Sequence, residues 1–201
     1  MIANHIHDAM GQVRRMQELV LAKQRFKGYS GKARVVGAAV ALLGAFAMSR
    51  SAFPALPLAH LGGWTGVLVI GIIANYGGLA IWFMRDPAVQ RDLMQLKPAA
   101  DALPALGIGA VLSLSLVVHE QYDLLFGSWM CLYGLVHVAY RQSLPKTNYV
   151  VGVFYMLCGT YCLLSPCVSF TNPWPMGLVF GTGELAGGIV LYRNRMEEPE
   201  L

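Results

Sequence analysis

The sequence has few charged residues. Lys, Arg, Asp and Glu make up 13% of its 201 residues, whereas 56% are hydrophobic and the mean hydropathy is +0.50. A chain this apolar falls outside the range of ordinary soluble domains. Composition alone therefore indicates a membrane protein.

Motifs of several enzyme and cofactor classes are missing as well. The sequence has no glycine-rich phosphate loop followed by Lys-Ser/Thr, no His-Glu-x-x-His and no Gly-x-Ser-x-Gly. No lysine lies within its long apolar segments, which excludes a retinal Schiff base. Outside those segments are only residues 1–30 and short loops, too little for a soluble catalytic domain. We therefore predict that the protein is not an enzyme and holds no cofactor.

The four cysteines form no Cys-x-x-Cys redox motif. Cys158 and Cys162 are one helical turn apart, Cys167 follows in a loop, and Cys131 lies in a different apolar segment. Cys162 and Cys167 are the candidate disulfide if their loop faces an oxidising compartment. The alternative is that the thiols pack as small apolar side chains.

Six apolar segments account for most of the chain. They cover residues 34–49, 62–84, 102–118, 124–140, 148–165 and 174–192. Each approaches the roughly 20 residues needed to cross about 30 Å of hydrocarbon. We predict an all-α polytopic membrane domain over residues 31–201, with six transmembrane helices and a cytoplasmic amphipathic helix within residues 1–30.

A three-fold internal repeat runs through these segments. The second, fourth and sixth share glycine, six residues, glycine-aliphatic, five residues and arginine, beginning at Gly71, Gly127 and Gly181. The other three share Gly-x4-Leu. The repeat predicts three tandem helical hairpins, at about 34–85, 102–141 and 148–195, related by a pseudo-three-fold axis. We expect the repeated glycines to form a shared packing interface around that axis.

Basic residues indicate the orientation. If the N-terminus is cytoplasmic, every Lys and Arg except Arg50 falls on the inside. The positive-inside rule then places both termini in the cytoplasm, which we expect to be that of a bacterial inner membrane. Because basic residues beside the inner leaflet favour anionic lipid, the net charge of +4 predicts the lipid bilayer as partner and no nucleic acid.

The first 27 residues have the pattern of an amphipathic helix. Apolar side chains recur at spacings of three and four, at Ile6, Met10, Val13, Met16, Leu19 and Val20. One interpretation is a helix lying on the inner membrane surface. The other is a docking helix for a second copy or a membrane-protein partner.

Functional side chains are expected where one repeat departs from the other two. Aligning the repeats sets Glu184 against Ala74 and Met130, and sets Asn75 and His137 against apolar or thiol residues. Glu184 is about ten residues inside its segment, or about 15 Å, near the bilayer midplane. We predict that Glu184, with Asn75 as partner, binds a proton or small solute, and that His137 belongs to the same set of candidates. The alternative is a protonated Glu184 that only joins helices.

A second polar cluster lies on the predicted outer side. His60 precedes the second segment, and His119, Glu120 and Asp123 lie in a short loop between the third and fourth. These residues are weak metal candidates, since their spacing matches no specific ligand pattern. The alternative is a solvated turn with a helix cap from Asp123. We predict no metal site.

Six spans in three hairpins, with Gly-x6-Gly-aliphatic and Gly-x4-Leu patterns, resemble the HdeD-like bacterial acid-resistance membrane proteins. The run from residue 16 to residue 44 also resembles small bacterial multi-span proteins of unknown function. The resemblance implies a non-enzymatic, stress-related inner-membrane protein.

Three hypotheses follow. The first is a non-enzymatic stress or scaffold protein that associates through its N-terminal helix. The second is a small transporter or channel that uses Glu184. The third is a membrane enzyme or redox protein with an outward His, Glu or Cys site.

Overall fold

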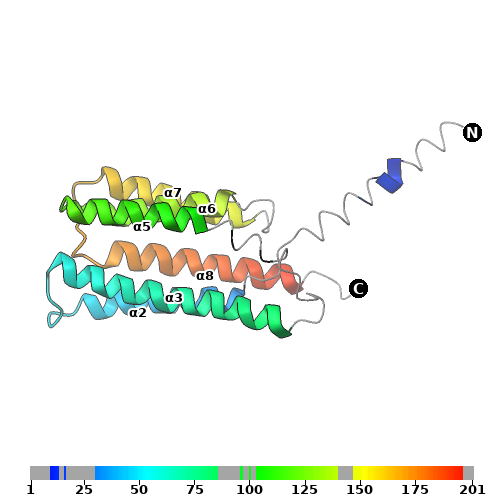
Figure 1. Ribbon diagram of the computed structural model, residues 1–201, viewed down its shortest axis with the longest axis horizontal. Coiled ribbons are helices and arrows are strands. Elements are labelled where there is room, and N and C mark those ends of the chain that lie inside the picture. The colour runs from blue at the N-terminus through cyan, green and yellow to red at the C-terminus, as the bar shows by residue number, and fades with distance from the viewer. Residues whose placement is uncertain are drawn as a thin grey trace, which may run out of the picture.

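The computed structural model describes residues 10–13, 16, 30–85, 96, 100, 103–139 and 147–196, with side chains to residue 193. Within these ranges the regular elements are helices, joined by turns and loops, and no strand is present (Figure 1). The elements, in order, are α2 (Gly31–Met48), α3 (Pro57–Arg85), α5 (Leu103–Val118), the 3-10 turn η3 (Tyr122–Leu124), α6 (Leu125–Ala139), α7 (Thr147–Leu164) and α8 (Trp174–Met196). Four of them, α2, α3, α7 and α8, are long and apolar enough to cross a membrane, and α5 is a shorter apolar helix.

Each of the six predicted apolar segments is mainly helical over its described residues. Local signals explain where several begin. The Ser30 hydroxyl accepts a hydrogen bond from the Ala33 amide at the start of α2, and Pro57 opens α3, where its missing N–H costs nothing. The Asn172 side chain accepts from the Trp174 amide at the start of α8. The largest difference from the predicted boundaries is at the start of α3, which begins at Pro57 and not at residue 62.

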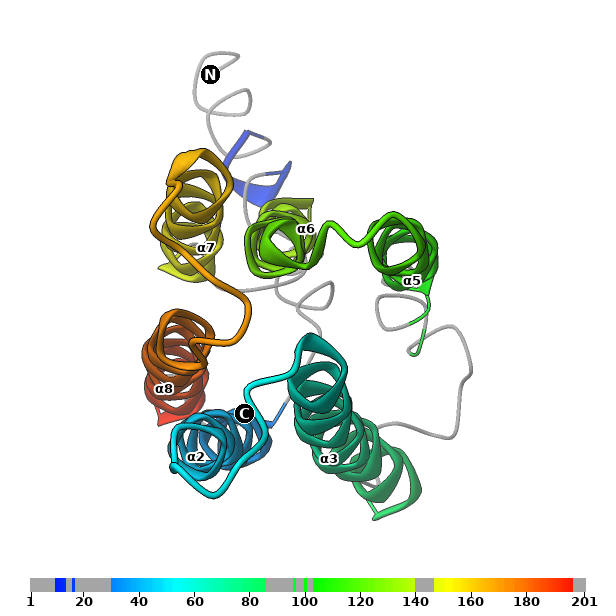
Figure 2. The same ribbon diagram turned by 90° about the vertical axis from the view of Figure 1, so that its left-hand side faces the viewer.

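The helices form two layers. Seen end-on, α5, α6 and α7 make one row and α3, α2 and α8 the other (Figure 2). Packing is most extensive between α6 and α7 and between α2 and α8, and the main contact between the layers is α7 against α8. We call the end at which α2 begins and α8 ends the proximal end, and the opposite end the distal end.

Glycines bring the helices of each layer close together. A Cβ on Gly134 would lie 2.6 Å from the carbonyl oxygen of Gly152, and one on Gly31 would lie 2.8 Å from that of Gly188. Such contacts let backbones approach where lipid supplies no hydrophobic drive. The α6–α7 and α2–α8 pairs are therefore closely packed units.

The expectation of one shared glycine interface around an axis is wrong. Gly127 packs on α7 and Gly181 on α2, whereas a Cβ on the equivalent Gly71 would meet nothing within 4 Å. The reason is the layered arrangement: each repeated glycine that makes contact serves a neighbouring helix pair. Glycines at corresponding places in the predicted repeat thus have different surroundings in the structure.

An apolar cluster joins the layers toward the distal end. Phe126 and Phe170 are fully buried there, with ring centroids 4.8 Å apart, and Trp64 of the other layer meets Phe126 edge-on. The Asp123 carboxylate accepts a hydrogen bond of 2.7 Å from the Phe170 amide. Asp123 thus anchors the α7–α8 loop: its carboxylate binds the Phe170 amide in place of the helix-capping bond that we considered.

The turn after α5 is a Schellman motif with a non-glycine residue in the left-handed position. The Gln121 amide donates to Leu116 O and the Glu120 amide to Val117 O, with Glu120 at φ 57°. Because glycine adopts this conformation without strain, we expect Glu120→Gly to raise the free energy of unfolding by up to about 1 kcal/mol. Denaturant unfolding in detergent micelles measures it; a loss of stability would mean that the exposed Glu120 side chain makes a stabilising contact.

Most of the predicted N-terminal amphipathic helix lies outside the described residues. Within them, residues 10–13 and 16 are helical, and Met10, Val13 and Met16 are exposed.

Candidate functional site

A buried ion pair lies between α2 and α8. The Arg34 guanidinium makes two parallel hydrogen bonds to Glu184, from Nε to Oε2 at 3.0 Å and from Nη2 to Oε1 at 2.8 Å. Each residue is only 5% exposed. A two-pronged arginine–carboxylate contact is the strongest geometry available to such a pair. Among residues whose burial is described, these two are the buried charged side chains.

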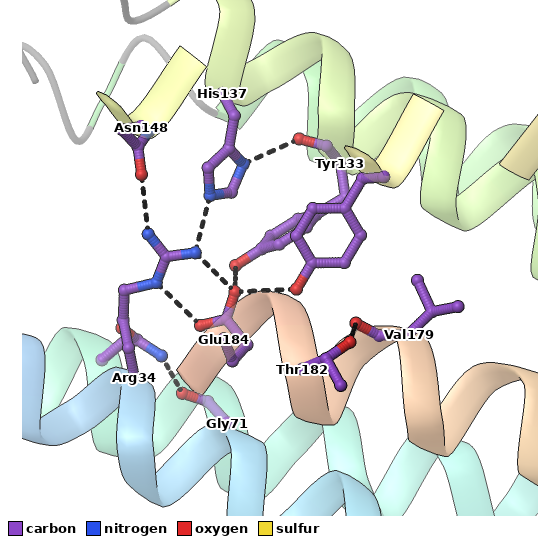
Figure 3. A network of polar contacts seen from close by, with 10 residues as sticks. Arg34, Gly71, Tyr133, His137, Asn148, Val179, Thr182 and Glu184 are labelled. Carbon is purple, nitrogen blue, oxygen red and sulfur yellow. Dashed lines mark hydrogen bonds and ion pairs between the residues drawn. The ribbon is translucent and has the colours of Figure 1, made fainter. Parts of the chain in front are cut away.

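The other layer supplies neutral partners to this pair (Figure 3). From α6, the Tyr133 hydroxyl donates to Glu184 Oε1 at 2.8 Å, and from α7 the Tyr155 hydroxyl donates to the same oxygen at 3.2 Å. Asn148, near the start of α7, accepts a bond of 2.9 Å from Arg34 Nη1. The interlayer network is the name used below for this set of six residues: Arg34, Glu184, Tyr133, Tyr155, Asn148 and His137.

The hydrogen bonds of His137 define its tautomer. Its Nδ1 lies 2.9 Å from the Tyr133 carbonyl oxygen, which can only accept, so Nδ1 carries a proton. Its Nε2 lies 2.9 Å from Arg34 Nη2, which can only donate, so Nε2 holds a lone pair. His137 is therefore neutral, and the network as a whole carries no net charge.

Two glycines on α8 make room for the partners of Glu184. A Cβ on Gly183 would lie 2.5 Å from the Tyr155 hydroxyl oxygen, and one on Gly187 would clash with the Arg34 guanidinium. These positions flank Glu184 one residue before it and three after it. Their sequence spacing suggests helix packing, but here the glycines accommodate polar side chains.

One polar atom in the network has no partner. The Asn148 side chain is 1% exposed, and its Nδ2 makes no hydrogen bond although its Oδ1 is bound to Arg34. A buried amide donor without an acceptor costs about 1–3 kcal/mol. The network thus offers one more hydrogen bond than it uses.

The structure brings two of the three predicted intramembrane candidates together. Glu184 and His137 both contact Arg34, but Asn75 is apart from them and donates to Gly71 O on its own helix at 3.0 Å. The partner of Glu184 is thus Arg34, which the sequence classes with the basic residues that flank the first span. Tyr133, Tyr155 and Asn148 were also missed.

The weak metal candidates do not converge. His60 is buried on α3, whereas His119 and Glu120 lie exposed in the distal turn and Asp123 binds the Phe170 amide. In the parts of the chain that the structure describes, no three His, Cys, Asp or Glu side chains gather at metal-binding distance.

All four cysteines are free thiols in this structure. Cys162 is buried on α7, with its Sγ 4.0 Å from Met130 Sδ, and Cys167 is exposed. The structure therefore does not contain the candidate disulfide, and Cys162 packs as a small apolar side chain instead.

Comparison of the chain with family models, curated proteins and solved structures found no match. The site itself defines a class: a protein whose described residues form helices, several of them candidate membrane spans, with a buried arginine–glutamate pair in one layer that faces the other layer.

Proposed function

We propose that this protein is a six-span carrier of the bacterial inner membrane, with both termini in the cytoplasm, that moves a small organic anion together with a proton. The observation that carries the proposal is the division of the interlayer network. Both charges belong to one closely packed helix pair, α2–α8, and all their neutral partners belong to the other, α6–α7.

This division allows the layers to separate while the two charges stay paired. Among the polar contacts of the network, opening would break the hydrogen bonds to Tyr133, Tyr155, His137 and Asn148, while the Arg34–Glu184 pair stays intact. The apolar cluster around Phe126 and Phe170 would act as the distal hinge. Rocking of one helical unit against another around a central site is the usual mechanism of small secondary transporters.

Charge balance indicates what such a site would carry. An uncompensated charge inside a membrane costs at least about 2–3 kcal/mol. If a solute carboxylate replaces Glu184 on the Arg34 guanidinium, Glu184 must take up a proton to keep the site neutral. One anionic charge then moves with one proton, and the Asn148 Nδ2 donor would gain an acceptor from the solute.

Six spans remain compatible with the two shorter helices. Sixteen residues of α5 extend about 24 Å, and α6 with the 3-10 turn before it extends about 28 Å. Both approach the thickness of the hydrocarbon core. The sequence repeat and the placement of basic residues support three hairpins with cytoplasmic termini.

The test is uptake of L-lactate and D-gluconate into proteoliposomes under an inward proton gradient. We expect the wild type and Glu120→Gln, a control in the exposed distal turn, to accumulate at least one of these acids. Glu184→Gln should reduce the proton-dependent rate at least about tenfold, because the variant cannot exchange its proton. Rates are normalised to folded protein.

Uptake by the wild type no faster than by empty liposomes would overturn the proposal. It would return the protein to the stress or scaffold hypothesis, which the exposed apolar residues Met10, Val13 and Met16 support. Equal proton-dependent uptake by wild type and Glu184→Gln would overturn the role of the carboxylate.

A further inference from the structure

Side chains that contain sulfur meet where α6 packs against α7. The Cys162 thiol on α7 donates to Met130 Sδ on α6, with the two sulfur atoms 4.0 Å apart. Nearby on the same pair of helices, the Cys131 thiol donates to the Met156 carbonyl oxygen at 3.8 Å. Cys158 is one turn before Cys162 on α7. The Cys162–Met130 pair therefore consists of two metal-ligating atoms that already face each other.

This sulfur pair is enclosed and lies outside the interlayer network. Met130 is 0% exposed and Cys162 is 5% exposed, and both belong to the apolar cluster that joins the layers. Met130 is three residues before Tyr133 on α6, and Cys162 is seven residues after Tyr155 on α7. These spacings place the sulfur pair about 5 to 10 Å from the two tyrosines along the helices, toward the distal end. No residue of the proposed transport site is part of it.

The proton between the two sulfur atoms occupies a place that a soft metal cation can take. Thiolate and thioether sulfur are the ligands that favour Cu(I). Two metal–sulfur bonds of about 2.3 Å span up to about 4.6 Å, so the atoms need to move apart by about 0.6 Å at most. The flexible methionine side chain permits such a shift. On binding, the S–H bond of Cys162 breaks, a bond from its Sγ to the metal forms, and the proton leaves to water.

Charge balance favours a monovalent ion at this place. The Cys162 thiol is neutral, and its thiolate with one monovalent cation is neutral as well. A divalent cation would leave a positive charge without a partner, which is costly inside a membrane. Among residues whose burial is described, the buried charged side chains are Arg34 and Glu184, and these neutralise each other. The pair thus suits Cu(I) better than Zn²⁺.

We propose that Cys162 and Met130 form a binding site for Cu(I) between α6 and α7, independent of the interlayer network. The half-buried thiols of Cys131 and Cys158 provide the route by which the ion enters and the proton leaves. Cys131 Sγ lies close to the α7 backbone, since a Cβ on Gly159 would be 2.6 Å from it, and Gly159 directly follows Cys158. An ion exchanged between these thiols reaches Cys162 one turn further along α7.

The test is competition for Cu(I) between the protein in phosphatidylcholine nanodiscs and bathocuproine disulfonate, with ascorbate present and oxygen excluded. We expect the folded wild type to retain one equivalent of Cu(I), and Cys162→Ala to lose it with the thiolate. Met130→Leu keeps the side-chain volume and the fold. It should bind at least about tenfold more weakly, because even indirect partners of metal ligands contribute about 10–100-fold to affinity.

Single-cysteine variants separate this site from other thiols. Cys167→Ala removes the exposed thiol in the α7–α8 loop and should retain Cu(I) as the wild type does. Cys131→Ala and Cys158→Ala should load more slowly but reach the wild-type affinity, because these thiols serve only for entry. Circular dichroism checks that each variant is folded.

Three outcomes would overturn the proposal. One is a folded wild type that yields all its Cu(I) to bathocuproine disulfonate. Another is wild-type affinity in Met130→Leu, which would mean that the thioether is not a ligand. The third is loss of the bound ion in Cys167→Ala, Cys131→Ala or Cys158→Ala, which would assign it to a different thiol.

Discussion

Replacing Glu184 by glutamine alone will lower the free energy of unfolding by about 3–5 kcal/mol, because Arg34 then remains buried without its counter-charge. The Arg34 side chain is almost fully enclosed and cannot turn to solvent without leaving its place beside Gly187. Removing one member of a buried pair costs more than the pair itself contributes.

Removing both charges gives a different result. We expect Arg34→Met with Glu184→Leu to be within about 1–2 kcal/mol of the wild type, since apolar replacements of a buried pair are often neutral or stabilising. The hydroxyls of Tyr133 and Tyr155 lose their acceptor in this variant, which accounts for the remaining loss. Unfolding in mixed detergent micelles, followed by circular dichroism, measures both variants.

The double variant also separates structure from function. If it is stable and takes up no lactate or gluconate, the ion pair is retained for transport and not for folding. If the double variant is as unstable as Glu184→Gln, the pair is a structural joint between the layers. That result would support the interpretation of Glu184 as a group that only joins helices, with Arg34 as its partner.

The sequence predicts the helices well, because each is a long apolar run bounded by polar or turn-forming residues. It also identifies Glu184 and His137, because each interrupts an otherwise repeated apolar pattern. The sequence does not predict the buried role of Arg34, and the reason is physical. It stands at the junction of a basic segment and an apolar one, where a buried partner and a solvated membrane anchor look the same.

The remaining network residues depend on tertiary structure. Tyr133 and Tyr155 read as ordinary aromatic residues of membrane helices, and only their positions opposite Glu184 give their hydroxyls an acceptor. The signal that points to such partners is the pair of glycines at 183 and 187 around a buried carboxylate. Two missing side chains beside a buried charge indicate that other side chains fill the space.

The second large expected loss of stability concerns glycines that occupy the same place in the sequence pattern but have different neighbours in the structure. In Gly127→Ala the new methyl would lie 2.7 Å from the Gly159 carbonyl oxygen and 2.5 Å from Leu163 Cγ. The backbone of α7 cannot yield as a flexible side chain does, so α6 and α7 must move apart. We expect a loss of about 1–3 kcal/mol, as for other overpacked contacts.

Gly71→Ala is the matched control, because Gly71 occupies the same place in the repeat and has nothing within 4 Å. Alanine is the better helix former, so this variant should be unchanged or more stable by up to about 1 kcal/mol. Gly181→Ala should fall between the two, since the three atoms nearest its new methyl all belong to the flexible Leu42 side chain. Unfolding of all three variants in the same micelles measures the series. If Gly71→Ala lowers the free energy of unfolding as much as Gly127→Ala does, the face of α3 that carries Gly71 must pack against another helix in the membrane. The layer that contains α3 would then continue beyond α3.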